Sequence, residues 1–175
     1  MRKWIGSALL VAAVAFNAGE LAAQRRPAAR PAPSSSQRTS FGLQLDWGND
    51  PNFGIGGRGV FSLQPLFPKT PLDGIVSFDY FFPGNSVHYW EINGNVAYRF
   101  TVPRSSSLGP YAGGGLNIAH GSVSGVSGSG ATKAGLNLLG GTTFKMKRSN
   151  LTPFVEGRGE VGGGKTFILT GGVRF

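Results

Sequence analysis

The 175-residue sequence contains no cysteine, and charged residues make up only 14% of it. The absence of cysteine excludes a disulfide scaffold, a zinc–thiolate site and a cysteine nucleophile. Soluble domains usually contain about 25% charged residues. Low charge combined with 11% aromatic residues excludes an intrinsically disordered main body, since disorder requires high charge and few aromatics. Acidic residues are also scarce, 8 against 17 basic ones, so the meaning of the net charge of +9 depends on where the charges lie.

Two hydrophobic patterns are missing as well. After Ser40 the chain has no apolar run of 18 residues, the pattern typical of a transmembrane helix. It also has no sustained helical stripe of apolar residues. Glycine, in contrast, is abundant with 29 residues, yet it follows no collagen-like triplet repeat.

The first 40 residues differ in composition from the rest. Residues 1–23 combine two basic residues near the start, an apolar run over Ile5–Phe16 and small residues before a cleavage site after Ala23, which predicts a secretory signal peptide. The run is shorter than the roughly 20 residues of a spanning helix, although an N-terminal membrane anchor remains the alternative. Residues 24–40 hold three prolines, four arginines and no large apolar residue, so we expect a disordered linker.

Much of the basic charge lies in this linker. Loss of residues 1–23 would leave 15 basic and seven acidic residues, and four of those basic residues are linker arginines. A linker of this kind can touch anionic lipid or cell-wall polymer, but a solvated spacer is the simpler interpretation. The basic residues expected to be exposed on the body lie in turns without a platform of exposed aromatics, so nucleic acid is not an expected partner.

From residue 41 onward, apolar residues alternate with polar residues or glycine in eight segments separated by turn residues. A period of two predicts β-strands, and most segments have the 9–11 residues that cross a bilayer when tilted. An even number of strands lets the last pair with the first, which closes the sheet. We therefore expect an all-β fold, an eight-stranded antiparallel up-and-down transmembrane β-barrel, with strands near 41–47, 53–61, 76–82, 88–100, 110–118, 134–146, 153–161 and 167–175.

The two faces of these strands carry different residues. One face is apolar and has aromatics near the strand ends, as in the girdles at membrane interfaces: Trp47, Phe82, Trp90, Phe100, Phe144, Phe167 and Phe175. The other face holds five acidic and six basic residues, Asp46, Arg58, Asp79, Glu91, Arg99, Lys133, Lys145, Glu156, Arg158, Glu160 and Arg174.

The charged face is expected inside the barrel. A charge facing lipid costs roughly 2–4 kcal/mol at the bilayer midplane, whereas opposite charges inside can pair. A soluble lipocalin-like barrel would show the reverse distribution. Because eight strands enclose a space just wide enough for side chains, we expect a nearly neutral ion-pair network that seals the interior.

The signal peptide, the eight alternating strands and the terminal GGVRF resemble the small outer-membrane β-barrel proteins of the OmpA, OmpX and OmpW type. The stretches LGPYAGGGLNIA and LTPFVEGRGEV are similar to recurring strand openings in that group. The resemblance covers residues 41–175 and implies an outer-membrane location, contact with outer-membrane lipids and a periplasmic linker. It also implies insertion by the outer-membrane assembly machinery, through a C-terminal signal formed by Phe167, Leu169, Val173 and Phe175.

Two glycine-rich stretches match nucleotide-binding patterns without the required context. Residues 159–166, GEVGGGKT, fit the phosphate-binding loop, but only nine residues of strand pattern follow, so no helix can present its N-terminus to a phosphate. Residues 54–59, GIGGRG, fit the dinucleotide pattern, but the prolines that follow preclude the helix it needs. His88 has no second histidine or cysteine nearby. We therefore expect no cofactor and no metal.

Three functions remain open. The first is structural: a small integral outer-membrane barrel with a sealed polar interior and no chemistry of its own. The second is a minor channel or a binding protein for small apolar compounds. The third is a lipid A-modifying hydrolase, because His120-Gly121-Ser122 resembles the His-x-Ser pair of outer-membrane lipid A deacylases, although residues 121–155 contain no acid to orient the histidine.

The carboxylates Glu156 and Glu160 share one strand face and could in principle perform acid–base catalysis. Arg158 lies between them, which favours an ion-pair network instead. The sequence therefore favours the structural function, without enzymatic activity.

Overall fold

The computed structural model describes residues 39–49, 52–84, 86–125, 130–162 and 165–175. The predicted signal peptide over 1–23 and nearly all of the predicted linker over 24–40 lie outside these residues. The described residues form eight strands: β1 (Thr39–Gly48), β2 (Phe53–Ser62), β3 (Leu72–Phe81), β4 (Val87–Arg99), β5 (Leu108–Val123), β6 (Ala131–Phe144), β7 (Thr152–Val161) and β8 (Lys165–Arg174). In this part of the chain, no helix is long and apolar enough to cross a membrane.

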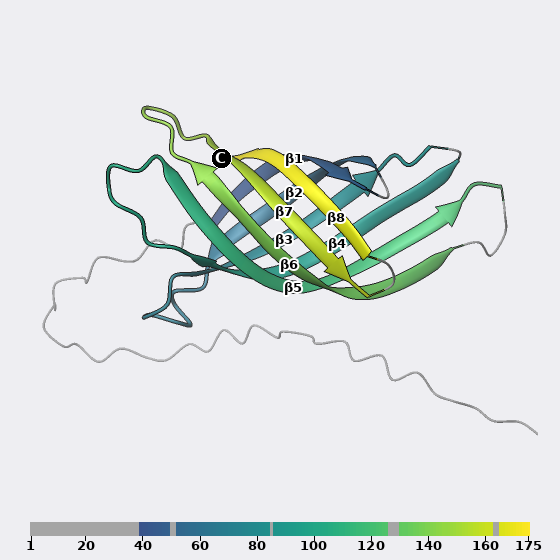
Figure 1. Ribbon diagram of the computed structural model, residues 1–175, viewed down its shortest axis with the longest axis horizontal. Coiled ribbons are helices and arrows are strands. Elements are labelled where there is room, and N and C mark those ends of the chain that lie inside the picture. The colour runs from purple at the N-terminus through teal and green to yellow at the C-terminus, as the bar shows by residue number, and fades with distance from the viewer. Residues whose placement is uncertain (1–38, 50–51, 85, 126–129, 163–164) are drawn as a thin grey trace, which may run out of the picture. The chain divides into compact units, whose positions relative to one another are not determined.

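Each strand pairs antiparallel with the next, and β1 also pairs with β8, so the sheet closes into a barrel (Figure 1). The predicted eight-stranded antiparallel barrel is confirmed. Closure gives every strand a paired neighbour on both sides through the central part of the barrel, which is the condition for a sheet that faces lipid. At the seam, Phe41 and Phe175 exchange two backbone hydrogen bonds of 3.1 and 2.8 Å.

The barrel has two ends that differ in their turns. We call the end that carries Thr39 and Phe175 the proximal end; its turns are residues 63–71, 100–107 and 145–151. The opposite, distal end carries the turns that follow β1, β3, β5 and β7. The distal turns after β3 and β7 change direction through glycines in the left-handed region, Gly84 with φ +80° and Gly162 with φ +112°, a conformation that glycine adopts without steric cost.

Alternation along each strand separates two faces. In β1, Leu43 and Trp47 point outward and are 69% and 70% exposed, whereas Gln44 and Asp46 point inward and are 3% and 1% exposed. Successive side chains on a strand face opposite sides, so this pattern continues around the barrel. Of the seven predicted girdle aromatics, six are exposed on the outside and Trp90 is half-buried.

Several strand limits differ from the sequence prediction. β3 starts at Leu72 rather than at residue 76, because residues 72–75 pair with residues 95–98 of β4. β1 starts two residues early, because residues 39–40 pair with residues 60–61 of β2. β5 includes residues 120–123, which were expected in a loop, because the ladder with β4 continues to Val123. β6 ends at Phe144, opposite the first residue of β5, so residues 145–146 lie in the next turn.

Candidate functional site in the barrel interior

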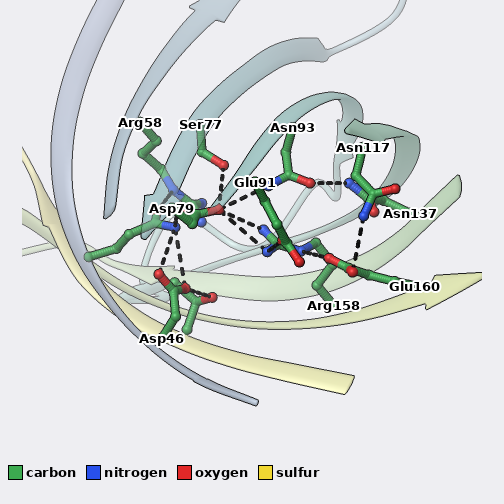
Figure 2. A network of polar contacts seen from close by, with 12 residues as sticks. Asp46, Arg58, Ser77, Asp79, Glu91, Asn93, Asn117, Asn137, Arg158 and Glu160 are labelled. Carbon is green, nitrogen blue, oxygen red and sulfur yellow. Dashed lines mark hydrogen bonds and ion pairs between the residues drawn. The ribbon is translucent and has the colours of Figure 1, made fainter. Parts of the chain in front are cut away.

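Inward polar side chains from all eight strands gather into one network, which we call the interior network (Figure 2). Its charged members belong to the face that the sequence placed inside, and none is more than 6% exposed: Asp46, Arg58, Asp79, Glu91, Glu156, Arg158 and Glu160. Buried charges are stable only when they are paired and hydrogen-bonded, so the partners of each one decide whether this interior can exist.

Arg158 of β7 is the centre of the network. Its Nε donates to Glu160 at 2.9 Å, and its Nη2 donates to Glu91 at 2.9 Å. Both terminal nitrogens also lie 3.4 Å from Asp79 Oδ2. Because Asp79 lies on β3 and Glu91 on β4, this one guanidinium ties β7 to the opposite wall of the barrel.

A second arginine makes the other cross-barrel link. Arg58 of β2 and Glu156 of β7 form a two-pronged pair, with Nη1–Oε2 and Nη2–Oε1 distances of 3.0 Å each. Such fork-to-fork pairs are stronger and more directional than single contacts. Tyr111 donates a further hydrogen bond to Glu156 at 2.8 Å, and the Arg58 guanidinium lies 4.1 Å from the ring centroid of Phe154.

Neutral donors complete the shell of Asp79. Gln44 donates to it at 2.7 Å, Asn93 at 2.9 Å and Ser77 at 3.0 Å. The same Gln44 side chain accepts from Arg58 Nε, so it joins the two arginine centres. The carboxylate is therefore held by one charged and three neutral donor residues.

Further amides and hydroxyls extend the network along the barrel. Asn137 donates to Asn93 at 2.9 Å and to Asn95 at 3.0 Å, Asn117 donates to Glu160 at 3.0 Å, and Thr170 donates to Asp46 at 2.6 Å. These neutral residues were not among the predicted site residues. Their position on the same alternating face as the charges was the signal that could have identified them.

An apolar layer lies on the proximal side of the network. It consists of Val60, Ile75, Ala97, Tyr111 and Leu139, all buried and in mutual contact. On each strand these residues follow the buried polar ones toward the proximal end; Val60, for example, follows Arg58. The interior thus contains two layers in series, buried ion pairs and then buried apolar side chains.

Three of the predicted interior residues, Arg99, Lys145 and Lys133, are exposed at or beyond the rims, and a fourth, Arg174, is only partly buried. Arg99 is at the proximal rim, where its half-exposed side chain pairs with Asp73 at 3.1 Å. Lys145 is exposed in the turn after β6, and Lys133 is exposed at the distal end of β6. Arg174 points inward but is only half-buried, and no described residue accepts a hydrogen bond from its Nε. Alternation predicts which face of a strand a residue occupies but not its position along the barrel axis, which is why Arg99, Lys133 and Lys145 were expected inside.

The interior therefore contains fewer basic residues than the sequence predicted. The sequence predicted five acidic against six basic residues, but the buried charged residues of the described chain are five carboxylates and two guanidinium groups. Amide and hydroxyl donors therefore take over part of the stabilisation that lysine and arginine were expected to provide. The result is an acid-rich network rather than a balanced one.

A cavity of about 210 Å³ lies at the distal mouth of the barrel and is lined in part by Tyr89, Lys133, Asn117 and Glu160. Asn117 and Glu160 belong to the interior network, so the cavity meets the sealed interior rather than an open lumen. Within the described ranges, no three histidine, cysteine or acidic residues are grouped so as to hold a metal ion.

The two histidines lie on the outer face near the distal end. His120 bonds the Thr132 hydroxyl at 2.8 Å and stacks on Trp90 with a centroid distance of 5.3 Å. His88 lies between the hydroxyls of Tyr80, at 2.6 Å, and Ser124, at 2.7 Å. In the part of the chain that the structure describes, both histidines bond hydroxyl groups and neither bonds the carboxylate that would orient a catalytic base.

The glycine-rich matches lie in the sheet. Residues 54–59 are part of β2, residues 159–161 end β7, and β8 begins at Lys165. A strand stands where the phosphate-binding loop would need a helix, so neither stretch has the geometry of a nucleotide site.

Solved structures of known proteins have a similar architecture. No protein-family model and no curated protein matches the sequence. The N-terminal β-barrel domain of OprF from Pseudomonas aeruginosa has a TM-score of 0.60 and 17% identity, over 78% of this chain and 96% of that chain. Neisserial surface protein A has a TM-score of 0.58 and 17% identity, over 78% and 94%. The chain therefore has the fold of the small eight-stranded outer-membrane β-barrels, as its sequence resemblance predicted.

Proposed function

We propose that this protein is an integral outer-membrane β-barrel with a sealed interior and a structural role in the cell envelope. The observation that carries the proposal is its inverted distribution of side chains. Asp79 and Glu91 are 0% exposed inside the barrel, whereas Leu138 and Trp47 are 75% and 70% exposed outside it. Water-soluble monomers rarely expose a continuous apolar surface, but a bilayer covers one without cost.

Strand length supports the same conclusion. Every strand has at least ten residues, and β5 has 16, which suffices to cross the hydrocarbon core at a tilt. By resemblance to the outer-membrane barrels, the proximal end with both ends of the barrel chain faces the periplasm. The linker over residues 24–40 then lies in the periplasm as well.

The route into the membrane follows from the same resemblance. Phe167, Leu169, Val173 and Phe175 are outward-facing on β8 and at its end, and Phe175 is 61% exposed. A terminal aromatic on an accessible strand suits recognition by the outer-membrane assembly machinery before the seam with β1 closes.

A structural role fits the interior better than transport. Arg58 and Arg158 cross the barrel to strands on the far side, and the apolar layer blocks the remaining path. The hydrolase alternative lacks an oriented base, since the two histidines bond hydroxyls instead. Both observations favour a barrel that performs no transport and no chemistry.

Membrane fractionation combined with gel mobility tests this proposal. A closed barrel is expected to migrate differently before and after boiling and to stay in the membrane fraction after extraction with high salt. Protein held in 8 M urea and never refolded is the control for the boiled position. Recovery of a folded, water-soluble monomer in the salt extract would contradict the proposal.

A further inference from the structure

The three proximal turns carry charge of one sign. Residues 63–71, 100–107 and 145–151 contain no acidic residue, and their five basic residues are all exposed: Lys69, Arg104, Lys145, Lys147 and Arg148. We call these five residues the basic collar. None of them takes part in an ion pair with another described residue, and Asp73, the acidic residue near the start of β3, is bound to Arg99 at the rim.

The turns at the distal end lack basic residues. They span residues 49–52, 82–86, 124–130 and 162–164. The two basic residues nearest to it in the sequence, Lys133 and Lys165, belong to β6 and β8. The charge asymmetry between the ends is therefore a property of the turns rather than of the barrel as a whole.

Each basic turn also exposes large apolar side chains. Leu66 and Phe67, 73% and 50% exposed, precede Lys69, and Phe100, 49% exposed, precedes Arg104. Met146, 52% exposed, lies between Lys145 and Lys147, and Leu151 follows at 47%. A cation beside an exposed apolar side chain suits the boundary between head groups and acyl chains, where the apolar part enters lipid and the cation reaches a phosphate.

We propose that the basic collar binds the head groups of anionic phospholipids in the leaflet at the proximal end, while its apolar neighbours enter the adjoining acyl-chain region. This inference rests on the proposed membrane insertion. Unpaired cations near a bilayer surface favour net-negative lipids over zwitterionic ones, and the preference grows with the number of cations. A polyanionic cell-wall polymer would also attract the cations, but it would leave the apolar side chains of all three turns in water, so lipid is the better partner.

Electron spin resonance of spin-labelled lipids tests the proposal in the intact barrel. The protein is folded into phosphatidylcholine vesicles, and the association of spin-labelled phosphatidylglycerol is compared with that of spin-labelled phosphatidylcholine. We expect at least a twofold preference for phosphatidylglycerol at low salt, weakened in about 1 M salt, where the Debye length is near 3 Å. Both leaflets have the same composition, so the orientation of the barrel does not matter.

A matched pair of double variants tests whether the lipid preference depends on the basic collar. Lys147→Gln/Arg148→Gln removes two collar charges, and Lys133→Gln/Lys165→Gln removes two charges outside it, so both change the net charge equally. The collar variant is expected to lose half or more of the preference and the control to keep it; replacing all five collar residues should abolish it. Because the collar residues are exposed and lie outside the strands, heat-dependent gel mobility should remain normal in every collar variant.

The possible negative results distinguish the collar proposal from the proposed function. Absence of a lipid preference in the inserted wild-type barrel, or an equal loss in both double variants, would overturn the collar proposal while leaving membrane insertion intact. Salt-sensitive binding of the protein to purified cell-wall sacculi without any lipid preference would also overturn it, in favour of the polymer. Failure to insert into vesicles at all would instead contradict the proposed function.

Discussion

The guanidinium of Arg158 contacts three carboxylates that come from three strands, those of Asp79, Glu91 and Glu160. The side chain is 1% exposed, so water cannot replace these contacts. Removing one partner of a buried ion network leaves uncompensated charge, which costs far more than the loss of an exposed pair. Arg99, half-exposed at the proximal rim and paired with Asp73, provides the comparison within the same barrel.

We expect Arg158→Ala to lower the free energy of unfolding by about 3–5 kcal/mol. Arg99→Ala should lower it by at most about 1 kcal/mol, because its pair is exposed to water and salt. Urea titration of the refolded barrels in vesicles, followed by tryptophan fluorescence, measures both values. Equal losses in the two variants would show that the interior network contributes no more than the rim pair.

At the scale of the strands, glycine allows side chains from neighbouring strands to meet inside the barrel. Gly56 of β2 lies between Gln44 of β1 and Asp79 of β3. A Cβ at this position would meet the Asp79 carboxylate, and it would lie 2.8 Å from the backbone oxygen of Phe78 and 3.1 Å from Gln44 Cγ. On the outer face, a Cβ at Gly94 of β4 would meet nothing within 4 Å.

Gly56→Ala is therefore expected to destabilise the barrel by roughly 1–3 kcal/mol, since overpacking displaces side chains that hold the network. Gly94→Ala should change stability by no more than about 0.5 kcal/mol. The same urea titration compares the two. If Gly56→Ala leaves the free energy of unfolding unchanged, the barrel can accommodate the added methyl group without losing the hydrogen bond between Gln44 of β1 and Asp79 of β3.

At the scale of the whole molecule, the barrel is closed by two layers of different chemistry. The interior network crosses from β7 to β2, β3 and β4, and the apolar layer fills the space nearer the proximal end. An ion needs a continuous water-filled path, and both layers place buried side chains along the barrel interior. Because the layers act in series, opening one of them does not create a pore.

We expect the purified protein to show no steady conductance in planar bilayers, and Glu156→Ala to behave in the same way because the apolar layer remains. Single-channel recording at both polarities measures this directly. A refolded barrel with normal heat-dependent gel mobility serves as the check that folded protein was inserted. Reproducible single-channel steps whose size changes in Glu156→Ala would support the channel alternative.

The amino-acid sequence by itself determined the strands and their two faces. A period of two is a local property, because successive side chains on a strand always face opposite sides. Gln44 and Asp46 could therefore be separated from Leu43 and Leu45 without any tertiary information. The number of strands and the closure of the sheet followed from counting such segments.

The tertiary structure decided which charges meet. Register and closure set the height of each residue along the barrel, so Arg99, Lys133 and Lys145 lie at or beyond the rims, although alternation had placed them on the inward face. The pairing of Arg158 with Asp79, 79 positions apart in sequence, joins opposite walls and depends on the diameter of the closed barrel. No local pattern contains that distance, because it exists only once β1 has paired with β8.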